Sequence, residues 1–354
     1  MKSPGRDRPR LLLHSMYPLD RGLSGPTVRI NNMRDALQEI VDLDVVAGLR
    51  SRRALALARY IALGQLRGLA GIYVESSTTL PSPADIAFLA AARRRGIPVL
   101  TYIRDAYQLF PEYWSGTGLK QRVSRRLFIP TFRRLAQASS LVAFPSQGLA
   151  DALPLGRESI LLPPGAPRPL NVRRRRRANR LLFVGALRHA VLGAEILFEA
   201  MELVRAAGHP VELVCVSRPG DEPTQPLPSW MRVQRTSGKG IHALLPEVFA
   251  SVIPRRRSPY NDFAVPIKVM EYLSYGRPML VTDCIETARI VRSAGSGLVV
   301  ADTSTALAAG IIELSTGDPD ALDRYAEAGL AAAAANSWGS RAERVVTTLQ
   351  GLGA

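Results

Sequence analysis

The chain has 354 residues, of which 47% are hydrophobic and 21% are charged, as in a folded globular protein. This length exceeds one ordinary core and predicts two domains of roughly 150–180 residues each. No run of about 20 residues is free of charge, so the pattern excludes a transmembrane helix. Two distant cysteines and four scattered histidines give neither a disulfide framework nor metal-ligand spacing.

The net charge of +16 is distributed unevenly along the chain. Residues 1–170 carry +12, the tract 171–179 adds five arginines, and residues 180–354 carry −1. The asymmetry points to an anionic partner for the first half. An arginine bias of the genome explains it equally well, since only four of the basic residues are lysine.

The first half alternates short apolar segments with amphipathic ones, which predicts buried parallel strands joined by helices. The first helix is expected to begin near Pro26, which suits an initial helical position. A basic helix is expected over residues 119–136, bent at Pro130. The expected strands are Arg10–His14, Leu43–Ala47, Gly71–Glu75, Pro98–Ile103, Leu141–Phe144 and Ile160–Leu162.

A tract rich in proline and arginine, Pro163–Arg180, interrupts this alternation and reads as a linker. Strands are then expected at Leu181–Val184, Val211–Val216, near Arg232, at Ser251–Ile253, Met279–Thr282 and Gly297–Val300. Helices are expected at Gly193–Ala207, Ile241–Phe249, Pro266–Tyr275 and Glu286–Ser293, with two or three more at the end. The boundaries follow as 1–163 for the first domain, 164–180 for the linker, 181–335 for the second domain and 336–354 for a closing helix that packs back on the first domain.

Repeated strand–helix units imply parallel sheets with right-handed crossovers. The predicted fold class is therefore α/β, with two facing Rossmann-like domains. Ligands of such sheets bind at the carboxyl ends of the strands. The expected site is a cleft between the two domains.

The tract Ser258–Asp283 (SPYNDFAVPIKVMEYLSYGRPMLVTD) combines a helix start, a helix end and a buried strand. Lys268 and Glu271 are three residues apart and share one helix face. They are either a surface ion pair or a binding site, in which the carboxylate accepts ribose hydroxyls and the lysine meets a diphosphate.

This tract resembles the second domain of retaining GT-B glycosyltransferases of the "group 1" class. Five other segments match the family in the expected order: Asp20–Leu37, Thr101–Pro111, Phe144–Ala166, Arg180–Val204 and Asn336–Trp338. The resemblance implies transfer of a sugar from a UDP- or GDP-linked donor to a glycan, lipid-linked or small-molecule acceptor, with retention of configuration. It also implies that the nucleotide-sugar is the donor substrate and that no metal or other cofactor is required.

The resemblance assigns roles to individual positions. Donor binding falls to Gly25, Gly185, Arg188, Asp262, Lys268 and Glu271. Arg104 and Asp105 occupy the place of a histidine–aspartate pair and are the catalytic candidates. Phe263 stands where the family has a first glutamate, and Asp262 and Asn261 next to it are the candidates to replace that glutamate. If the enzyme instead inverted configuration, Asp105 or His14 would be the candidate base, although each is more often structural.

The expected helix 119–136 places Arg122, Arg125, Arg126 and Arg133 on one side and Leu119, Val123, Leu127 and Phe132 on the other. Such a helix can lie on an anionic bilayer, which fits a cytoplasmic protein at the inner face of the membrane and a lipid-linked acceptor. The alternative is that its apolar side faces the core and its basic side is solvated.

Three other functions remain open from the sequence. A basic nucleic-acid-binding protein fits the charge but lacks zinc-finger spacing and an RNA-binding aromatic motif. A dinucleotide-dependent oxidoreductase lacks the Gly-x-Gly-x-x-Gly turn after a strand. A hydrolase or epimerase of nucleotide sugars would share the GT-B fold.

Overall fold

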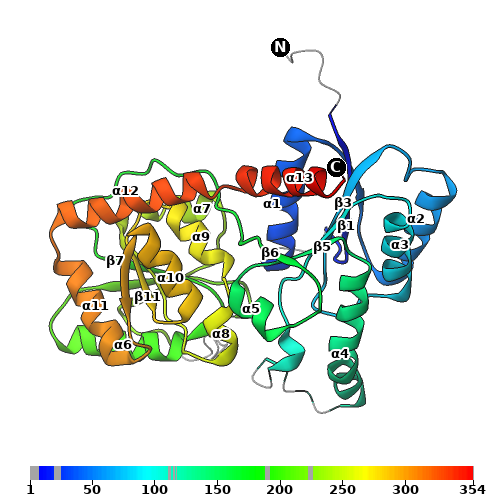
Figure 1. Ribbon diagram of the computed structural model, residues 1–354. Helices are drawn as coiled ribbons and strands as arrows, with labels where there is room; N and C mark the ends of the chain where they lie inside the picture. Colours follow the sequence, from blue (N-terminus) through cyan, green and yellow to red (C-terminus); the bar gives the residue numbers. More distant parts are fainter. Residues whose placement is uncertain are drawn as a thin grey trace. The chain divides into compact units, whose positions relative to one another are not determined.

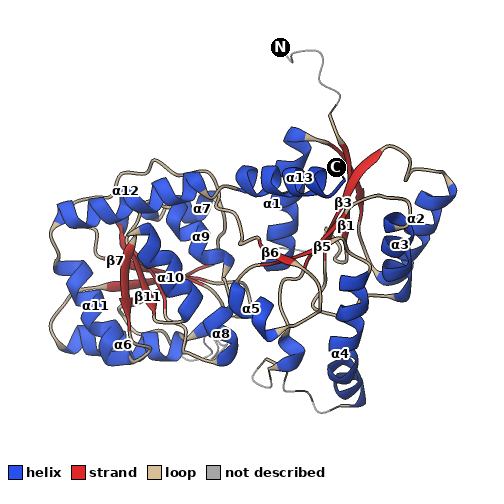
Figure 2. Cartoon of the chain, in the orientation of Figure 1, coloured by secondary structure: helices blue, strands red, loops and turns tan. Residues whose placement is uncertain are grey.

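The computed structural model describes residues 8–19, 25–110, 113–114, 116, 118–187, 192–221 and 226–353. The chain forms two compact units: unit 1 is Met1–Pro164 with Trp338–Ala354, and unit 2 is Gly165–Ser337. Each unit holds one parallel six-stranded sheet between helices (Figures 1 and 2). The predicted α/β class with two Rossmann-like domains is confirmed.

In unit 1 the strand order is β2-β1-β3-β4-β5-β6. The strands are β1 (Arg10–Ser15), β2 (Asp42–Val46), β3 (Leu69–Glu75), β4 (Val99–Tyr102), β5 (Leu141–Phe144) and β6 (Ser159–Leu161). The helices are α1 (Gly25–Ile40), α2 (Arg50–Ala62), α3 (Pro83–Arg93), α4 (Leu119–Gln137), α5 (Gln147–Ala152) and α13 (Trp338–Gly353), with a 3-10 turn at Tyr107–Leu109.

The C-terminal helix α13 completes the core of unit 1 and lies beside α1 (Figure 1). Leu11 and Leu13 of β1 pack in one cluster with Val345 and Leu349 of α13. Gly71 on β3 makes this approach possible, because a Cβ there would lie 3.1 Å from the Leu349 side chain. The Leu349 side chain of α13 therefore packs directly on the backbone of β3.

In unit 2 the order is β12-β11-β10-β7-β8-β9. The strands are β7 (Arg180–Val184), β8 (Glu212–Val216), β9 (Met231–Gln234), β10 (Val248–Ile253), β11 (Met279–Thr282) and β12 (Gly297–Val300). The helices are α6 (Ala194–Ala206), α7 (Lys239–His242), α8 (Pro259–Phe263), α9 (Ile267–Ser274), α10 (Ile285–Ala294), α11 (Ser304–Thr316) and α12 (Pro319–Ala335), with a 3-10 turn at Leu245–Glu247.

The central strand β7 is buried on both faces, as its apolar sequence predicts. Leu181 and Phe183 belong to a core cluster that includes residues of α6 and α11. Leu182 and Val184 pack into a second cluster, formed with α9 and other elements on the opposite face. The alternation along one strand thus joins the two helical layers.

The predicted helix Ile241–Phe249 is wrong. Only the short α7 and a 3-10 turn form there, and β10 already begins at Val248. Pro246 cannot donate a helical hydrogen bond, and the following residues are buried throughout β10.

The tract predicted as a linker lies within unit 2 from Gly165 onward. The Arg175 amide donates to the Pro246 carbonyl at 2.9 Å, and the Leu170 amide donates to the Ser274 carbonyl at 2.8 Å. Arg277 Nη1 donates to the Val172 carbonyl at 3.1 Å. These bonds attach a segment without apolar periodicity to the unit, a contact that composition does not reveal.

Candidate functional site

Both sheets have a point at which the strand order reverses. In unit 1 it lies between β1 and β3, and in unit 2 between β7 and β10. In open α/β sheets, ligands bind outside the carboxyl ends of the strands at such points. The carboxyl edges of the two sheets are therefore the places where functional side chains are expected.

In unit 2, helix α9 brings Lys268 and Glu271 to this edge. Lys268 Nζ lies 2.6 Å from Glu271 Oε2, and the two side chains are 39% and 15% exposed. The hydroxyl of Tyr272 accepts a hydrogen bond of 2.7 Å from the Val184 amide at the end of β7. This bond fixes α9 next to the strand end, so the predicted pair sits at the switch point with both charges accessible.

The loop after β7 approaches its neighbours closely. Gly193 precedes α6 with φ of 77°, and a Cβ there would fall 1.7 Å from the Pro254 carbonyl oxygen. At Gly185 a Cβ would lie 3.0 Å from the Phe183 ring, and its amide donates to the Val216 carbonyl at 3.0 Å. Arg188, expected to bind phosphate from this loop, lies outside the described residues.

The acid that was expected to replace the missing first glutamate is already paired. Asp262 accepts from Arg257 Nε at 3.1 Å and from Nη2 at 2.9 Å. Phe263 is buried, with its ring 5.0 Å from that of Tyr260. In this structure Asp262 thus neutralises an arginine at the edge of the unit.

The sequence reading missed a run of arginines at this edge. Arg255, Arg256 and Arg257 follow β10 after one proline, Pro254, beside the switch point. Arg257 is paired with Asp262, whereas the Arg256 side chain is exposed and has no partner among the described residues. The available signal was a cluster of like charges immediately after a buried strand.

In unit 1, Arg104 and Asp105 follow β4. Arg104 Nε lies 3.2 Å from Asp105 Oδ2, and Arg104 Nη2 donates to the Ser76 carbonyl at 3.2 Å. The guanidinium also lies 4.8 Å from the centre of the Tyr17 ring. Burial raises the pKa of Asp105, and the Arg104 charge only partly offsets it.

Three buried polar atoms of this loop have no hydrogen-bond partner within the described part of the chain. They are Arg104 Nη1, Asp105 Oδ1 and Gln108 Oε1. The Gln108 amide nitrogen, which the sequence reading did not single out, donates to the Thr78 carbonyl. One donor and two acceptors thus remain for a ligand at the carboxyl edge.

A second pair missed by the sequence reading lies deeper. Arg29 of α1 is 1% exposed and donates to Glu75 Oε1 at 3.2 Å and to the Tyr73 hydroxyl at 3.2 Å. Its guanidinium lies 3.5 Å from the centre of the Tyr102 ring. The pair attaches α1 to the ends of β3 and β4 and so holds the carboxyl edge of the unit 1 sheet in place. Gly25, expected to present its amide to the donor, is exposed at the start of the same helix.

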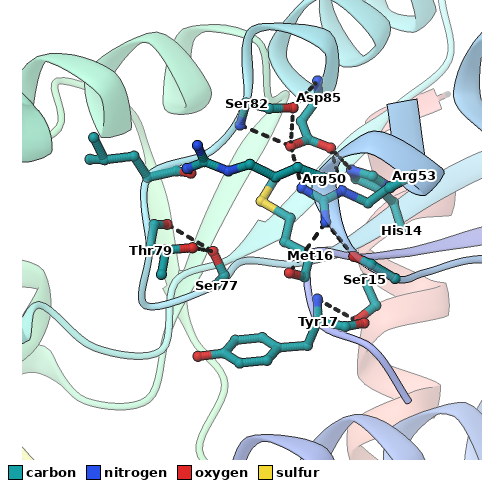
Figure 3. A network of polar contacts seen from close by, with 12 residues as sticks. His14, Ser15, Met16, Tyr17, Arg50, Arg53, Ser77, Thr79, Ser82 and Asp85 are labelled. Carbon is teal, nitrogen blue, oxygen red and sulfur yellow. Dashed lines mark hydrogen bonds and ion pairs between the residues drawn. The ribbon is translucent and has the colours of Figure 1, made fainter. Parts of the chain in front are cut away.

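His14, the alternative base, is held in a structural network (Figure 3). Its Nε2 lies 3.0 Å from Asp85 Oδ1, and Arg53 contacts both oxygens of that carboxylate at 2.7 Å. Ser82 adds a hydroxyl and an amide bond in the capping box of α3. Burial alone would raise the pKa of Asp85, but the bonds from Arg53 and His14 outweigh it and hold that pKa well below its usual range. The base role has no support from this arrangement.

The basic helix forms as α4, with Pro130 inside it. Arg122, Arg125, Arg126 and Arg133 are all exposed. Phe132 packs inward, but Leu119, Val123 and Leu127 are exposed by 71%, 46% and 45%. The expected apolar side is therefore split between a buried face and an exposed stripe.

No group of three or more His, Cys, Asp or Glu side chains in the described ranges is placed to hold a metal. Two Asp-x-Asp triplets, residues 42–44 and 318–320, are engaged elsewhere. Asp44 accepts from Arg10 and Tyr60, and Asp318 caps α12. Among the residues the structure describes, none of the helices is long and apolar enough to span a bilayer.

Comparison with known families identifies the second unit. Residues 178–316 match the family model "Glycosyl transferases group 1". Unit 2 contains a group 1 glycosyltransferase domain. The match includes β7, the β10–α8 loop and α9, which together form the edge described above, and it confirms the predicted resemblance and class of enzyme. It does not favour the nucleic-acid-binding or oxidoreductase alternatives.

Solved structures with a similar fold cover nearly the whole chain. Sucrose-phosphate synthase from Thermosynechococcus elongatus is 14% identical with a TM-score of 0.69, over 98% of this chain and 99% of that one. A glycosyltransferase from Rickettsia africae is 12% identical with a TM-score of 0.65, over 98% and 99%. The UDP-forming α,α-trehalose-phosphate synthase from Burkholderia xenovorans, in complex with glucose-6-phosphate, is 12% identical with a TM-score of 0.62, over 96% and 100%. These likenesses confirm the GT-B fold. No curated protein sequence matches the chain significantly.

Proposed function

We propose that this glycosyltransferase takes a sugar from a nucleoside-diphosphate donor, bound at the carboxyl edge of unit 2, and transfers it to a hydroxyl of an acceptor. The observation that carries the proposal is the accessible Lys268–Glu271 pair at the β7/β10 switch point. A carboxylate there can accept the ribose hydroxyls, and the ammonium can meet the diphosphate. The UDP-forming neighbour supports a donor of this class.

Cleavage of the anomeric C–O bond leaves negative charge on the departing nucleoside diphosphate. Cations already in place stabilise that charge without reorganising. We assign this role to Lys268, with Arg256 as the second cation and Arg188 as a further donor. Asp262 is proposed to contribute by holding Arg257 at the same edge. Bound ligand would separate Lys268 from Glu271, giving each a new partner.

Arg104 and Asp105 are proposed to act on the acceptor side. A carboxylate whose pKa is raised by burial is a stronger base than an exposed one, which suits Asp105 to accept a proton. The resemblance to retaining enzymes favours retention, in which case the pair positions the acceptor. Determining the anomeric configuration of the product decides between positioning and base catalysis.

A panel of UDP-, GDP- and TDP-sugars in a thermal-shift assay tests the donor class, since a ligand that binds only the folded state raises the melting temperature. Glu271→Ala should abolish the shift and lower kcat/KM by about 10–100-fold, the loss of a charged hydrogen bond. Glu343→Ala, a matched change of an exposed glutamate on α13 of unit 1, should leave both unchanged. A wild-type response in Glu271→Ala would refute the site.

We further propose that α4 lies on an anionic membrane surface while the enzyme works on a lipid-linked acceptor. The exposed stripe Leu119, Val123 and Leu127, next to exposed arginines, supports this placement. Apolar area and basic charge on one helix add their contributions to interfacial binding. Flotation with phosphatidylglycerol vesicles should fail for Leu119→Ser/Val123→Ser. Equal flotation of wild type and variant would contradict the proposal.

A further inference from the structure

A second concentration of positive charge lies at the opposite end of the unit 2 sheet. Arg173, Arg174, Arg175 and Arg176, with Pro246, line a hollow of about 500 Å³. This tract precedes β7, and Pro246 lies in the 3-10 turn that precedes β10. The hollow therefore lies at the amino ends of β7 and β10, whereas Lys268 and Glu271 lie at the carboxyl edge. A strand of five residues separates the two ends by roughly 16 Å.

The arginine tract is anchored rather than trailing in solvent. The Arg175 amide donates to the Pro246 carbonyl at 2.9 Å, and the Val172 carbonyl accepts from Arg277 at 3.1 Å. Because hydrogen bonds hold both the Val172 carbonyl and the Arg175 amide, the backbone that carries the arginines starts from a restricted set of positions. A ligand bound there loses less free energy to ordering the protein.

The charges in this hollow are only half balanced. Arg174 lies 2.8 Å from Asp323, and Arg175 pairs with Glu247. Arg173 and Arg176 are exposed and have no acidic partner in the described part of the chain. Two guanidinium groups therefore remain for an anion.

Arg277 adds a third positive charge nearby. It is 3% exposed and donates only to carbonyl groups, those of Leu245, Val172, Tyr275 and Gly276. Burial, with a smaller effect of Arg174, lowers the pKa of Arg277 to about 10, so it is still protonated at pH 7. This buried cation adds to the positive potential at the hollow.

We propose that the hollow binds a ligand carrying clustered phosphate groups, at a site separate from the donor site. Guanidinium forks bind phosphate through paired hydrogen bonds, and two or three positive charges match a diphosphate or triphosphate. The same phosphate chemistry occurs in free polyphosphates and in lipid headgroups, so the test uses both.

The experiment measures binding of tripolyphosphate to the full chain by calorimetry at constant ionic strength. Arg173→Gln/Arg176→Gln should weaken this binding at least about tenfold, because two charge-assisted contacts are lost. The matched control, Arg256→Gln/Lys268→Gln, removes the same charge at the carboxyl edge and should keep the binding at the hollow. Transfer activity of Arg173→Gln/Arg176→Gln with donor and acceptor should remain, which separates this site from the proposed function.

A second arm replaces tripolyphosphate with vesicles containing phosphatidylinositol 4,5-bisphosphate. Binding to either probe that is lost only in Arg173→Gln/Arg176→Gln supports the proposal and identifies the source of the phosphates. Binding of both probes whose affinity and stoichiometry are unchanged by this substitution, or no binding of either probe, overturns it. Binding of a DNA duplex alone, lost in the same variant, would overturn it in favour of a nucleic-acid surface.

Discussion

Ion pairs lie at the carboxyl edges of both sheets, but they are buried in unit 1 and exposed to solvent in unit 2. In unit 1 the pairs Arg29–Glu75 and Arg53–Asp85 are at most 3% exposed. In unit 2 the pair Lys268–Glu271 is 39% and 15% exposed. Buried pairs cannot exchange partners without a large loss of free energy, whereas exposed ones can. Unit 1 therefore presents a rigid surface, and unit 2 presents charges that a ligand can recruit.

The buried pair Arg29–Glu75 gives the largest expected effect. Arg29→Met leaves the Glu75 carboxylate buried without its cation, which should lower the free energy of unfolding by about 3–5 kcal/mol. Urea unfolding, with hydrogen exchange to localise the change to unit 1, measures this. Arg29→Met/Glu75→Leu should recover part of the loss. If the free energy of unfolding of Arg29→Met lies within about 1 kcal/mol of the wild-type value, burial does not make the unit 1 pair different from the unit 2 pair.

The Asp85 network should make unit 1 sensitive to acid. The folded-state pKa of Asp85 lies below its unfolded value of about 3.9, so its contribution is present above that pH and is lost as the pH falls below it. We expect the ionised Asp85 carboxylate to contribute about 2–3 kcal/mol to the free energy of unfolding at pH 7. Asp85→Asn should lower the melting temperature at pH 7, and the difference from wild type should shrink toward pH 3. A difference independent of pH would contradict the assignment.

The unpaired arginine at the unit 2 edge should affect catalysis and leave stability unchanged. Arg256→Gln should lower kcat about tenfold, the loss of roughly 1.4 kcal/mol of charge stabilisation. Steady-state kinetics with a UDP-sugar measures it. Arg52→Gln on α2, also an exposed arginine, is the control and should keep the wild-type rate.

The smallest effect is expected for the exposed pair itself. Lys268→Met should change the free energy of unfolding by less than about 1 kcal/mol, because an exposed ion pair contributes little. Urea unfolding of this variant beside Arg29→Met makes the comparison direct. A loss as large as that of Arg29→Met would mean that both edges are equally rigid.

The sequence predicted the fold well because its signals are local. Runs such as Leu181–Val184 identify strands buried on both faces, and Pro266 and Gly276 mark the ends of α9. The register that places Tyr272 against Val184 depends on contacts between distant residues, and no periodicity encodes it. The same holds for Arg29 and Glu75, which are 46 residues apart and read as an ordinary helix arginine and a strand-end glutamate.

The candidate site was predicted where a helix supplied the spacing. Lys268 and Glu271 share a helix face, so the structure had to bring them together. The sequence pattern did not reveal the partner of Asp262, because Arg257 comes from the loop before it. Residues 119–136 form the expected helix, yet which apolar residues face solvent depended on the packing of α4 and could not be read from the pattern.

The position of α13 has a consequence for biosynthesis. The helix that fills the face of the first sheet is translated only after the whole of unit 2. Until α13 is synthesised, β3 has no Leu349 side chain to cover Gly71. The nascent N-terminal half therefore exposes apolar surface. The order of synthesis and the order of completion are thus reversed, and chaperone dependence should concentrate on the half that is made first.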